Sequence, residues 1–147
     1  MDVKKIGLLG GRGYVGQEIF ELVNNHSKLS ITSVYSSSQA GLSVPGSAKD
    51  NSLSYLSMDL ANLELGNEDA YVLALPNDQS KGYVDKILEH NPKAILLDIS
   101  SDHRFNASWE YRLPELSEPV SATKISNPGC YATAMQLMLA PLVDNIS

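Results

Sequence analysis

Cys130, the only cysteine of the chain, stands in the string Ile-Ser-Asn-Pro-Gly-Cys-Tyr-Ala-Thr, directly after a Pro-Gly turn. Beyond it, apolar residues recur at helical spacing at Met135, Leu139 and Leu142. This pattern predicts a helix over residues 132–143 and places Cys130 at or next to its N-terminus. Free backbone N–H groups and the positive end of the helix dipole favour a thiolate there.

A thiolate in that position suits nucleophilic acyl transfer. The sulfur would attack a carbonyl carbon, and the N–H groups of the helix start would receive the oxyanion that develops. Cys130 is therefore the predicted catalytic residue. The alternative is that a lone cysteine serves only as a small buried hydrophobic residue.

A glycine-rich string follows the first apolar run of the chain and opens a helix. Its residues are Gly10, Gly11, Arg12, Gly13, Tyr14, Val15 and Gly16. The string satisfies the dinucleotide pattern Gly-x-Gly-x-x-Gly from Gly11, and a second spacing from Gly10 also ends on Gly16. Glycine permits the tight strand-to-helix turn and the close approach of a pyrophosphate, which the helix N-terminus then faces. The alternative is a merely structural glycine turn.

The end of the second expected strand indicates which nicotinamide cofactor is bound. NAD sites commonly place a carboxylate there to hold the ribose 2′-hydroxyl. This chain has Ser36, Ser37 and Ser38 instead, and Arg12 in the neighbouring turn can supply positive charge. The combination favours a 2′-phosphate and therefore NADP. The other interpretation is that the serines form a solvated loop.

Composition narrows the class of protein. The chain has 147 residues, 43% of them hydrophobic and 19% charged, which is typical of one soluble globular domain. Its net charge of −6 and its scattered basic residues argue against a nucleic-acid surface. Apolar stretches fall short of a membrane span, and no metal-ligand cluster is predicted. With its single cysteine and no recognisable signal peptide, the chain is expected in a reducing compartment.

Apolar runs alternate with helical patterns along the chain. Strands are expected at residues 5–9, 29–35, 71–75 and 94–98, and helices at 14–24, 80–89 and 132–143. In the first helix the expected apolar stripe is Val15, Ile19, Leu22 and Val23. Residues 36–67 are rich in Ser, Asn and Gly and are expected to form a long loop with one short strand. The alternation predicts an α/β, Rossmann-like, doubly wound fold with a mainly parallel sheet and helices on both faces.

Together these motifs resemble N-acetyl-γ-glutamyl-phosphate reductase, an arginine-biosynthesis enzyme, in the type found in fungi and some bacteria. The resemblance covers nearly the whole chain in the family's order: residues 10–16, 36–41, 74–77 (Ala-Leu-Pro-Asn), 97–105 (Leu-Asp-Ile-Ser-Ser-Asp-His-Arg-Phe), 113–116 (Leu-Pro-Glu-Leu) and 127–133. The Asn-Pro-Gly-Cys-Tyr string is the most specific, because the related aspartate-semialdehyde dehydrogenases have other residues around their cysteine.

The resemblance implies NADP-dependent reduction of N-acetylglutamyl 5-phosphate to the 5-semialdehyde through a thioester on Cys130. Carried over, the glycine string lines the pyrophosphate and the three serines lie at the adenosine end. Leu75, Pro76 and Asn127 would surround the nicotinamide, and Ser101, Arg104 and Asn127 would bind substrate. For Arg104 the alternative is a salt bridge within the turn at residues 102–105. Glu115 is expected to be an exposed loop carboxylate.

Members of this family are more than twice as long and take a general acid/base histidine from a second domain. We therefore expect residues 1–147 to be the NADP-binding domain with the catalytic cysteine, inactive alone and homo-oligomeric in the full-length enzyme. His26, His90 and His103 are expected to be surface or turn residues, and His103 stands where the family usually has an aromatic residue. The expected compartment is the cytoplasm, or the mitochondrial matrix for a fungal parent.

Two other functions stay open. One is an enzyme related to aspartate-semialdehyde dehydrogenase, with the same cysteine chemistry on another acyl phosphate. The other is a non-catalytic nucleotide-binding module in which Cys130 is only structural.

Overall fold

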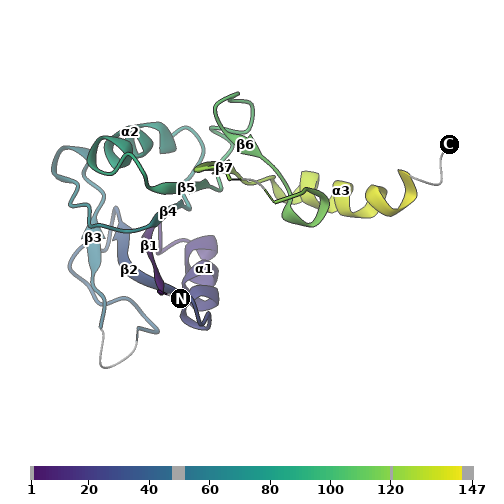
Figure 1. Cartoon of the computed structure of the whole chain (residues 1–147). Helices are drawn as coiled ribbons and strands as arrows, with labels where there is room; N and C mark the ends of the chain where they lie inside the picture. Colours follow the sequence, from purple (N-terminus) through teal and green to yellow (C-terminus); the bar gives the residue numbers. More distant parts are fainter. Residues whose placement is uncertain (1, 48–51, 120, 144–147) are drawn as a thin grey trace.

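The computed structural model describes residues 2–47, 52–119 and 121–143, which form an α/β fold built on one sheet (Figure 1). Its strands are β1 (Lys4–Leu9), β2 (Leu29–Ser36), β3 (Tyr55–Ser57), β4 (Ala70–Leu73), β5 (Ile95–Asp98), β6 (Glu110–Tyr111) and β7 (Lys124–Ser126). Its helices are α1 (Tyr14–Asn24), α2 (Ser80–His90) and α3 (Cys130–Val143), with short 3-10 turns at Leu60–Asn62 and Pro114–Leu116.

The described strands pair in the order β3-β2-β1-β4-β5-β7-β6, and every pairing between them is parallel. The chain runs outward from β1 to β3, returns, and continues from β4 on the other side of β1. This reversal beside β1 is the place where doubly wound sheets bind ligands at the carboxyl ends of their strands. The predicted Rossmann-like, parallel architecture is confirmed.

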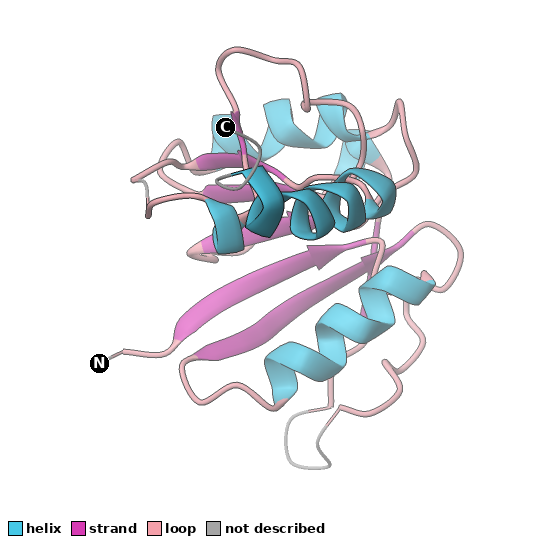
Figure 2. Ribbon diagram, turned by 90° about the vertical axis from the view of Figure 1, so that its right-hand side faces the viewer, coloured by secondary structure: helices cyan, strands magenta, loops and turns pink. Residues whose placement is uncertain are grey.

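Helices α1 and α2 cover opposite faces of the sheet (Figure 2). Neighbouring strand residues alternate between two apolar clusters, because successive side chains of a strand point to opposite faces. Leu8 packs with Phe20 of α1, whereas Leu9 packs with Ile87 of α2. Buried apolar residues on both faces explain why these strands read as nearly continuous hydrophobic runs.

The first helix has the predicted bounds, and half of its predicted apolar stripe is confirmed: Val23 is buried and Ile19 packs against the core, whereas Val15 and Leu22 are wrong. Val15 and Leu22 are 51% and 71% exposed, and the residues that α1 buries are Gly16, Phe20 and Val23. These three occupy positions i, i+4 and i+7 of one helix face. Gly16 decides the rotation, because only a residue without a side chain fits against the turn after β1.

The predicted loop at residues 36–67 and the predicted last helix are confirmed in outline, whereas two short strands were missed. Residues 36–67 form a long loop with the short strand β3, apart from residues 48–51, which lie outside the described residues. Strands β6 and β7 were missed, because they have only two and three residues and include charged Glu110 and Lys124. Helix α3 begins at Cys130, two residues earlier than predicted, and leads away from the sheet (Figure 1). None of its described residues is buried.

Candidate functional site

A cavity of about 300 Å³ opens at the carboxyl ends of β1, β2 and β4. It gathers many of the residues predicted to bind the cofactor, together with several that were not. Its lining residues are Gly10, Arg12, Gly13, Ser36, Ser37, Ser38, Met58, Ala74, Leu75, Pro76, Gln79 and Tyr83. The cavity therefore joins the glycine turn to the serine loop and to the loop after β4.

The turn between β1 and α1 requires glycine at Gly10 and Gly16. Gly10 has φ +79°, and a Cβ there would collide with the backbone oxygen of Ala74. A Cβ on Gly16 would collide with the Gly10 oxygen and would lie 2.7 Å from the Gly11 Cα. These contacts bring α1 close to the end of β1, which fixes where the helix N-terminus points.

The N-terminus of α1 can accept an anion. Gly13 is its N-cap and offers no side chain, and the nearest atom to a Cβ on Gly13 is the Gly10 oxygen at 3.4 Å. Among the described residues, the N–H groups of Tyr14, Val15 and Gly16 have no hydrogen-bond acceptor. Tyr14, Val15 and Gly16 are not among the residues that line the cavity. What they offer to a ligand is their free backbone N–H groups, which suit an anion.

Gly11 differs from the other glycines of the string. It lines another hollow, of about 490 Å³, beside α1 and Val44. A Cβ on Gly11 would collide with the Val34 side chain. Gly11 therefore allows the turn to pack closely on β2. It is not among the residues that line the cavity with the three serines.

Arg12 and the serine loop meet at the edge of the cavity. Arg12 Nη1 donates a hydrogen bond of 3.0 Å to Ser38 Oγ. Ser36 is buried, and its Oγ accepts the N–H groups of Ser38 and Gln39 at 3.4 and 3.2 Å, so it shapes the turn. Arg12 is the one charged residue among the described cavity lining, and no carboxylate lies beside it there. An arginine without a neighbouring carboxylate suits a phosphate.

Sequence reasoning missed Met58, Gln79 and Tyr83 of the lining. The Tyr83 hydroxyl donates to the Met58 carbonyl oxygen at 2.9 Å, which ties α2 to the loop after β3. Burial, helped by the nearby Asp59 charge, raises the pKa of Tyr83 and keeps it a donor. A helical pattern alone could not indicate that Tyr83 faces the strand ends, because the position depends on how α2 packs on the sheet.

Cys130 is the first residue of α3, and its thiol is free and exposed. The predicted helix-terminal position is therefore confirmed, and burial as a small hydrophobic residue is excluded. Thr133 N–H donates to the Gly129 oxygen at 2.9 Å. Within the described part of the chain, the N–H groups of Cys130, Tyr131 and Ala132 find no acceptor. They are available to an oxyanion.

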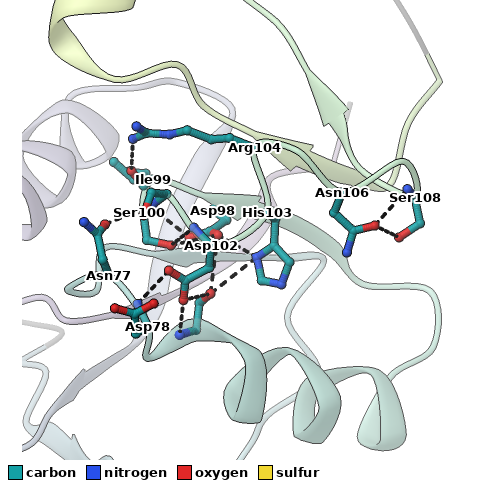
Figure 3. Close-up of polar contacts among 12 residues, drawn as sticks. Asn77, Asp78, Asp98, Ile99, Ser100, Asp102, His103, Arg104, Asn106 and Ser108 are labelled. Atoms are coloured by element: carbon teal, nitrogen blue, oxygen red, sulfur yellow. Dashed lines mark hydrogen bonds and ion pairs between the residues drawn. The ribbon is translucent and has the colours of Figure 1, made fainter.

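Arg104 lies against the turn before the cysteine. Its Nη1 is 2.8 Å from where a Cβ on Gly129 would sit, and its Nη2 donates to the Ile99 oxygen at 3.2 Å (Figure 3). Its buried Nε has no hydrogen-bond partner among the residues that the structure describes. The described residues contain no ion pair of Arg104, so the alternative salt bridge within the turn 102–105 is not formed.

The other predicted substrate contacts lie at neighbouring strand ends. Ser101 N–H donates to Asn77 Oδ1 at 3.0 Å. Asn127 follows β7, and its backbone N–H donates to the Asp98 oxygen at 2.8 Å, but Asn127 does not line the cavity with Leu75 and Pro76. Glu115 is exposed, as predicted.

His103 is not the surface residue that was predicted, although it does lie in a turn. It is 6% exposed, its Nδ1 lies 2.6 Å from Asp98 Oδ2, and its ring stacks on Trp109 with centroids 4.0 Å apart. The physical reason is that β5 ends on the fully buried carboxylate of Asp98, which needs buried donors. His26 and His90 are exposed.

The described residues contain neither a metal-ligand group nor a membrane-spanning helix. There, no three His, Cys, Asp or Glu side chains gather in a way that could hold a metal ion. A helix long and apolar enough to cross a membrane is not found among them either.

Residues 5–123 match a family model described as semialdehyde dehydrogenase, NAD binding domain. The chain belongs to this family. The match begins in β1 and contains the glycine turn, the serine loop and the loop after β5. The matched residues include all those that line the cavity, whereas Cys130 lies just beyond them.

Similar proteins agree with the resemblance seen in the sequence. The mitochondrial protein ARG5,6 of Candida albicans is 46% identical over 98% of this chain and 18% of its own length. An N-acetyl-gamma-glutamyl-phosphate reductase of Xanthomonas euvesicatoria is 40% identical over the whole of this chain and 48% of its own length. The chain therefore spans about half of the bacterial relative and less than a fifth of the fungal one.

A solved structure has the same fold. Aspartate semialdehyde dehydrogenase from Candida albicans, with NADP, aligns with a TM-score of 0.75 at 18% identity. The alignment covers 97% of this chain and 47% of that one. At this identity the likeness establishes the Rossmann-like architecture and nothing about the substrate.

Proposed function

We propose that residues 1–147 are the NADP-binding, cysteine-bearing domain of an N-acetyl-γ-glutamyl-phosphate reductase. The observation that carries this proposal is the combination, on one sheet, of an anion-accepting cavity with an exposed cysteine at a helix N-terminus. The 40% identity to the Xanthomonas reductase supports this substrate rather than that of aspartate-semialdehyde dehydrogenase, which resembles the chain in fold alone.

The cavity fits NADP. The free N–H groups at the start of α1 suit the pyrophosphate, and the Arg12–Ser38 pair suits a 2′-phosphate. Leu75 and Pro76 offer an apolar wall toward the nicotinamide end. Structural support for the choice of NADP over NAD comes from the arginine and the absence of a carboxylate in the described lining.

Cys130 is the proposed nucleophile. Its sulfur forms a bond to the acyl carbon, the carbon–oxygen bond to the phosphate group breaks, and inorganic phosphate leaves with the electron pair of that bond. The free N–H groups at the start of α3 stabilise the negative charge on the carbonyl oxygen. NADPH, when bound, supplies the hydride that reduces the resulting thioester. The Cys130 sulfur then leaves as thiolate, and the semialdehyde is released.

Arg104, Ser101 and Asn127 are the proposed substrate contacts. Arg104 brings the positive charge next to Gly129, where the phosphate or carboxylate of the substrate would approach. Its buried Nε, which has no partner among the described residues, leaves hydrogen-bonding capacity on that guanidinium. Ser101 and Asn127 stand at the ends of adjacent strands β5 and β7.

The whole enzyme's activity requires more than this chain. The chain spans about half of its bacterial relative, so we propose that a general acid/base histidine and most of the substrate pocket come from a longer protein. We propose further that this protein is a homo-oligomer that binds neither nucleic acid nor membrane. For a fungal parent the proposed compartment is the mitochondrion, as in the names of the fungal relatives, and for a bacterial parent it is the cytoplasm.

The test is an assay of the longer parent protein with two acyl phosphates. N-acetylglutamyl 5-phosphate with NADPH should turn over, and Cys130→Ser should abolish the activity. Turnover of aspartyl 4-phosphate instead would assign the protein to the related dehydrogenase. If the parent binds NADPH but reduces neither compound, the chain is a nucleotide-binding module.

A further inference from the structure

Asp102 lies between the two ends of the candidate site. The loop after β4 contributes Leu75, Pro76 and Gln79 to the cofactor cavity. The loop after β5 carries Arg104, which contacts the turn before Cys130. Asp102 belongs to the second loop, but its carboxylate is bonded to the first (Figure 3).

The bonds of Asp102 are short and use both carboxylate oxygens. Oδ1 accepts the Asp78 N–H at 2.7 Å, and Oδ2 accepts the N–H and the hydroxyl of Ser80 at 2.9 and 2.8 Å. A separate bond joins the same loops, from Ser101 N–H to Asn77 Oδ1 at 3.0 Å. Residues 77–80 are thus held by residues 101–102.

Two features of the first loop make it depend on this carboxylate. Asp78 has φ +66°, the one positive φ of a non-glycine residue in the described part of the chain, and such a conformation persists only where the surroundings hold it. The N-cap of α2, Gln79, makes no side-chain capping bond. Asp102 caps α2 from another loop, through Ser80, the first residue of the helix.

The second loop is fixed on its other side. His103 donates from Nδ1 to Asp98 Oδ2, and its ring stacks on Trp109. Arg104 follows directly and donates to the Ile99 oxygen. Asp102, His103 and Arg104 therefore form a short rigid link from the cofactor loop to Gly129.

We infer that Asp102 is a positioning residue, which couples the loop lining the cofactor cavity to the arginine beside the nucleophile. It touches neither the cavity nor Cys130 in the structure. Its role in reduction rests on the proposed function, whereas the coupling of the two loops is a property of the fold and can be tested without a substrate.

The first experiment measures backbone hydrogen exchange in this chain by mass spectrometry. Asp102→Ala should raise exchange in residues 77–80 and, because the loop that carries Arg104 is held less firmly, also at Thr133, whose N–H is the hydrogen-bonded one that the structure shows in residues 128–133. Asp85→Asn, an exposed acid on α2, should change neither segment. Ile87→Val is the control for stability: it removes a buried methyl group, lowers the unfolding temperature and should leave residues 128–133 unchanged.

The second experiment measures the alkylation rate of Cys130 by iodoacetamide under conditions where all variants are folded. Asp102→Ala should slow the reaction by about threefold to tenfold, because the loop that carries Arg104 loses its bonds to Asp78 and Ser80 and holds the guanidinium less firmly beside the turn. Asp102→Asn keeps one acceptor oxygen and should recover part of the rate. Asp102→Asn replaces the alanine variant in this measurement if that variant fails to fold. Ile87→Val, which lowers stability but leaves both loops intact, should react like the wild type. If Asp102 acted only on overall stability, Asp102→Ala would also react like the wild type.

Exchange that rises only in residues 77–80, with an unchanged alkylation rate, would overturn the coupling. The affinity for NADPH separates this outcome from failure of the proposed function. Asp102→Ala should raise the Kd about tenfold if the wild type binds the cofactor. If the wild type does not bind NADPH, the proposed function fails, and the exchange measurement still decides whether the loops are coupled.

Discussion

Replacing Gly13 with valine separates cofactor binding from folding. Gly13 has φ −64° and ψ 160°, an extended conformation that valine adopts readily. The nearest atom to a Cβ at this position is 3.4 Å away. We therefore expect the unfolding midpoint of Gly13→Val to stay within about 2 °C of the wild type. Gly16→Ala is the opposite case, because its Cβ would collide with backbone atoms and disrupt the turn.

Cofactor binding should nevertheless be lost in Gly13→Val. The new side chain would occupy the space in front of the free N–H groups of Tyr14, Val15 and Gly16, where the pyrophosphate is proposed to lie. Hydrogen bonds to charged groups contribute about 1.5–3 kcal/mol each. Losing two of them costs about 3–6 kcal/mol, which corresponds to about a 10²- to 10⁴-fold increase in Kd.

Fluorescence titration with NADPH measures this change, and circular dichroism verifies the fold. Gly13→Ala, with a smaller side chain, should lose less affinity than the valine variant. A folded Gly13→Val protein that binds NADPH within about threefold of the wild type would refute the placement of the pyrophosphate at α1.

Other predictions address the remaining parts of the site. NADPH should bind about tenfold more tightly than NADH, and Arg12→Ala should remove that preference; equal affinities in the wild type would end the argument for a 2′-phosphate site. Cys130 should react with iodoacetamide faster at pH 7 than a small model thiol does, and a rate no faster would count against the nucleophile. Burial alone would raise the pKa of Asp102, but the hydrogen bonds from Ser80 and Asp78 outweigh it and lower the pKa. The ionised carboxylate therefore stabilises the fold at any pH above the ordinary pKa of an aspartate. This stabilisation is lost as the pH falls through the lowered pKa of the folded state. Urea unfolding between pH 6 and 3 should therefore show a steeper loss of stability in the wild type than in Asp102→Asn, and parallel curves would contradict this assignment. The isolated chain should bind cofactor without turnover, and reduction of NADP with N-acetylglutamate 5-semialdehyde and phosphate within about tenfold of a full-length homologue would contradict the need for a further histidine.

Local signals in the sequence were sufficient for the parallel sheet, the glycine turn and the helix start at Cys130. The bounds of α1 follow from a glycine string and a periodic segment, which need no tertiary information. The face that α1 buries could not be predicted in the same way. It depends on the contact of Gly16 with the turn after β1, and this contact outweighs the exposed Val15 and Leu22.

The partners of His103 and Asp102 could not be predicted, because they join segments that sequence spacing does not relate. Asp98 is the last residue of the strand expected at 94–98, and no local signal indicates that it is fully buried with His103 as its partner. Asp102 looked like a turn residue, yet it caps a helix that begins 22 residues earlier. Tyr83 likewise reaches the cavity only through the packing of α2 on the sheet, and Met58 only through the pairing of β3 with β2.

In the proposed reaction Cys130 accepts the acyl group of N-acetylglutamyl 5-phosphate. The most direct test of this step is mass spectrometry of the longer parent protein after incubation with that acyl phosphate in the absence of NADPH. We expect an N-acetylglutamyl adduct on the peptide that contains Cys130, absent from Cys130→Ser and discharged when NADPH is added. An adduct on another residue, or none under conditions where the protein reduces the substrate, would contradict this step.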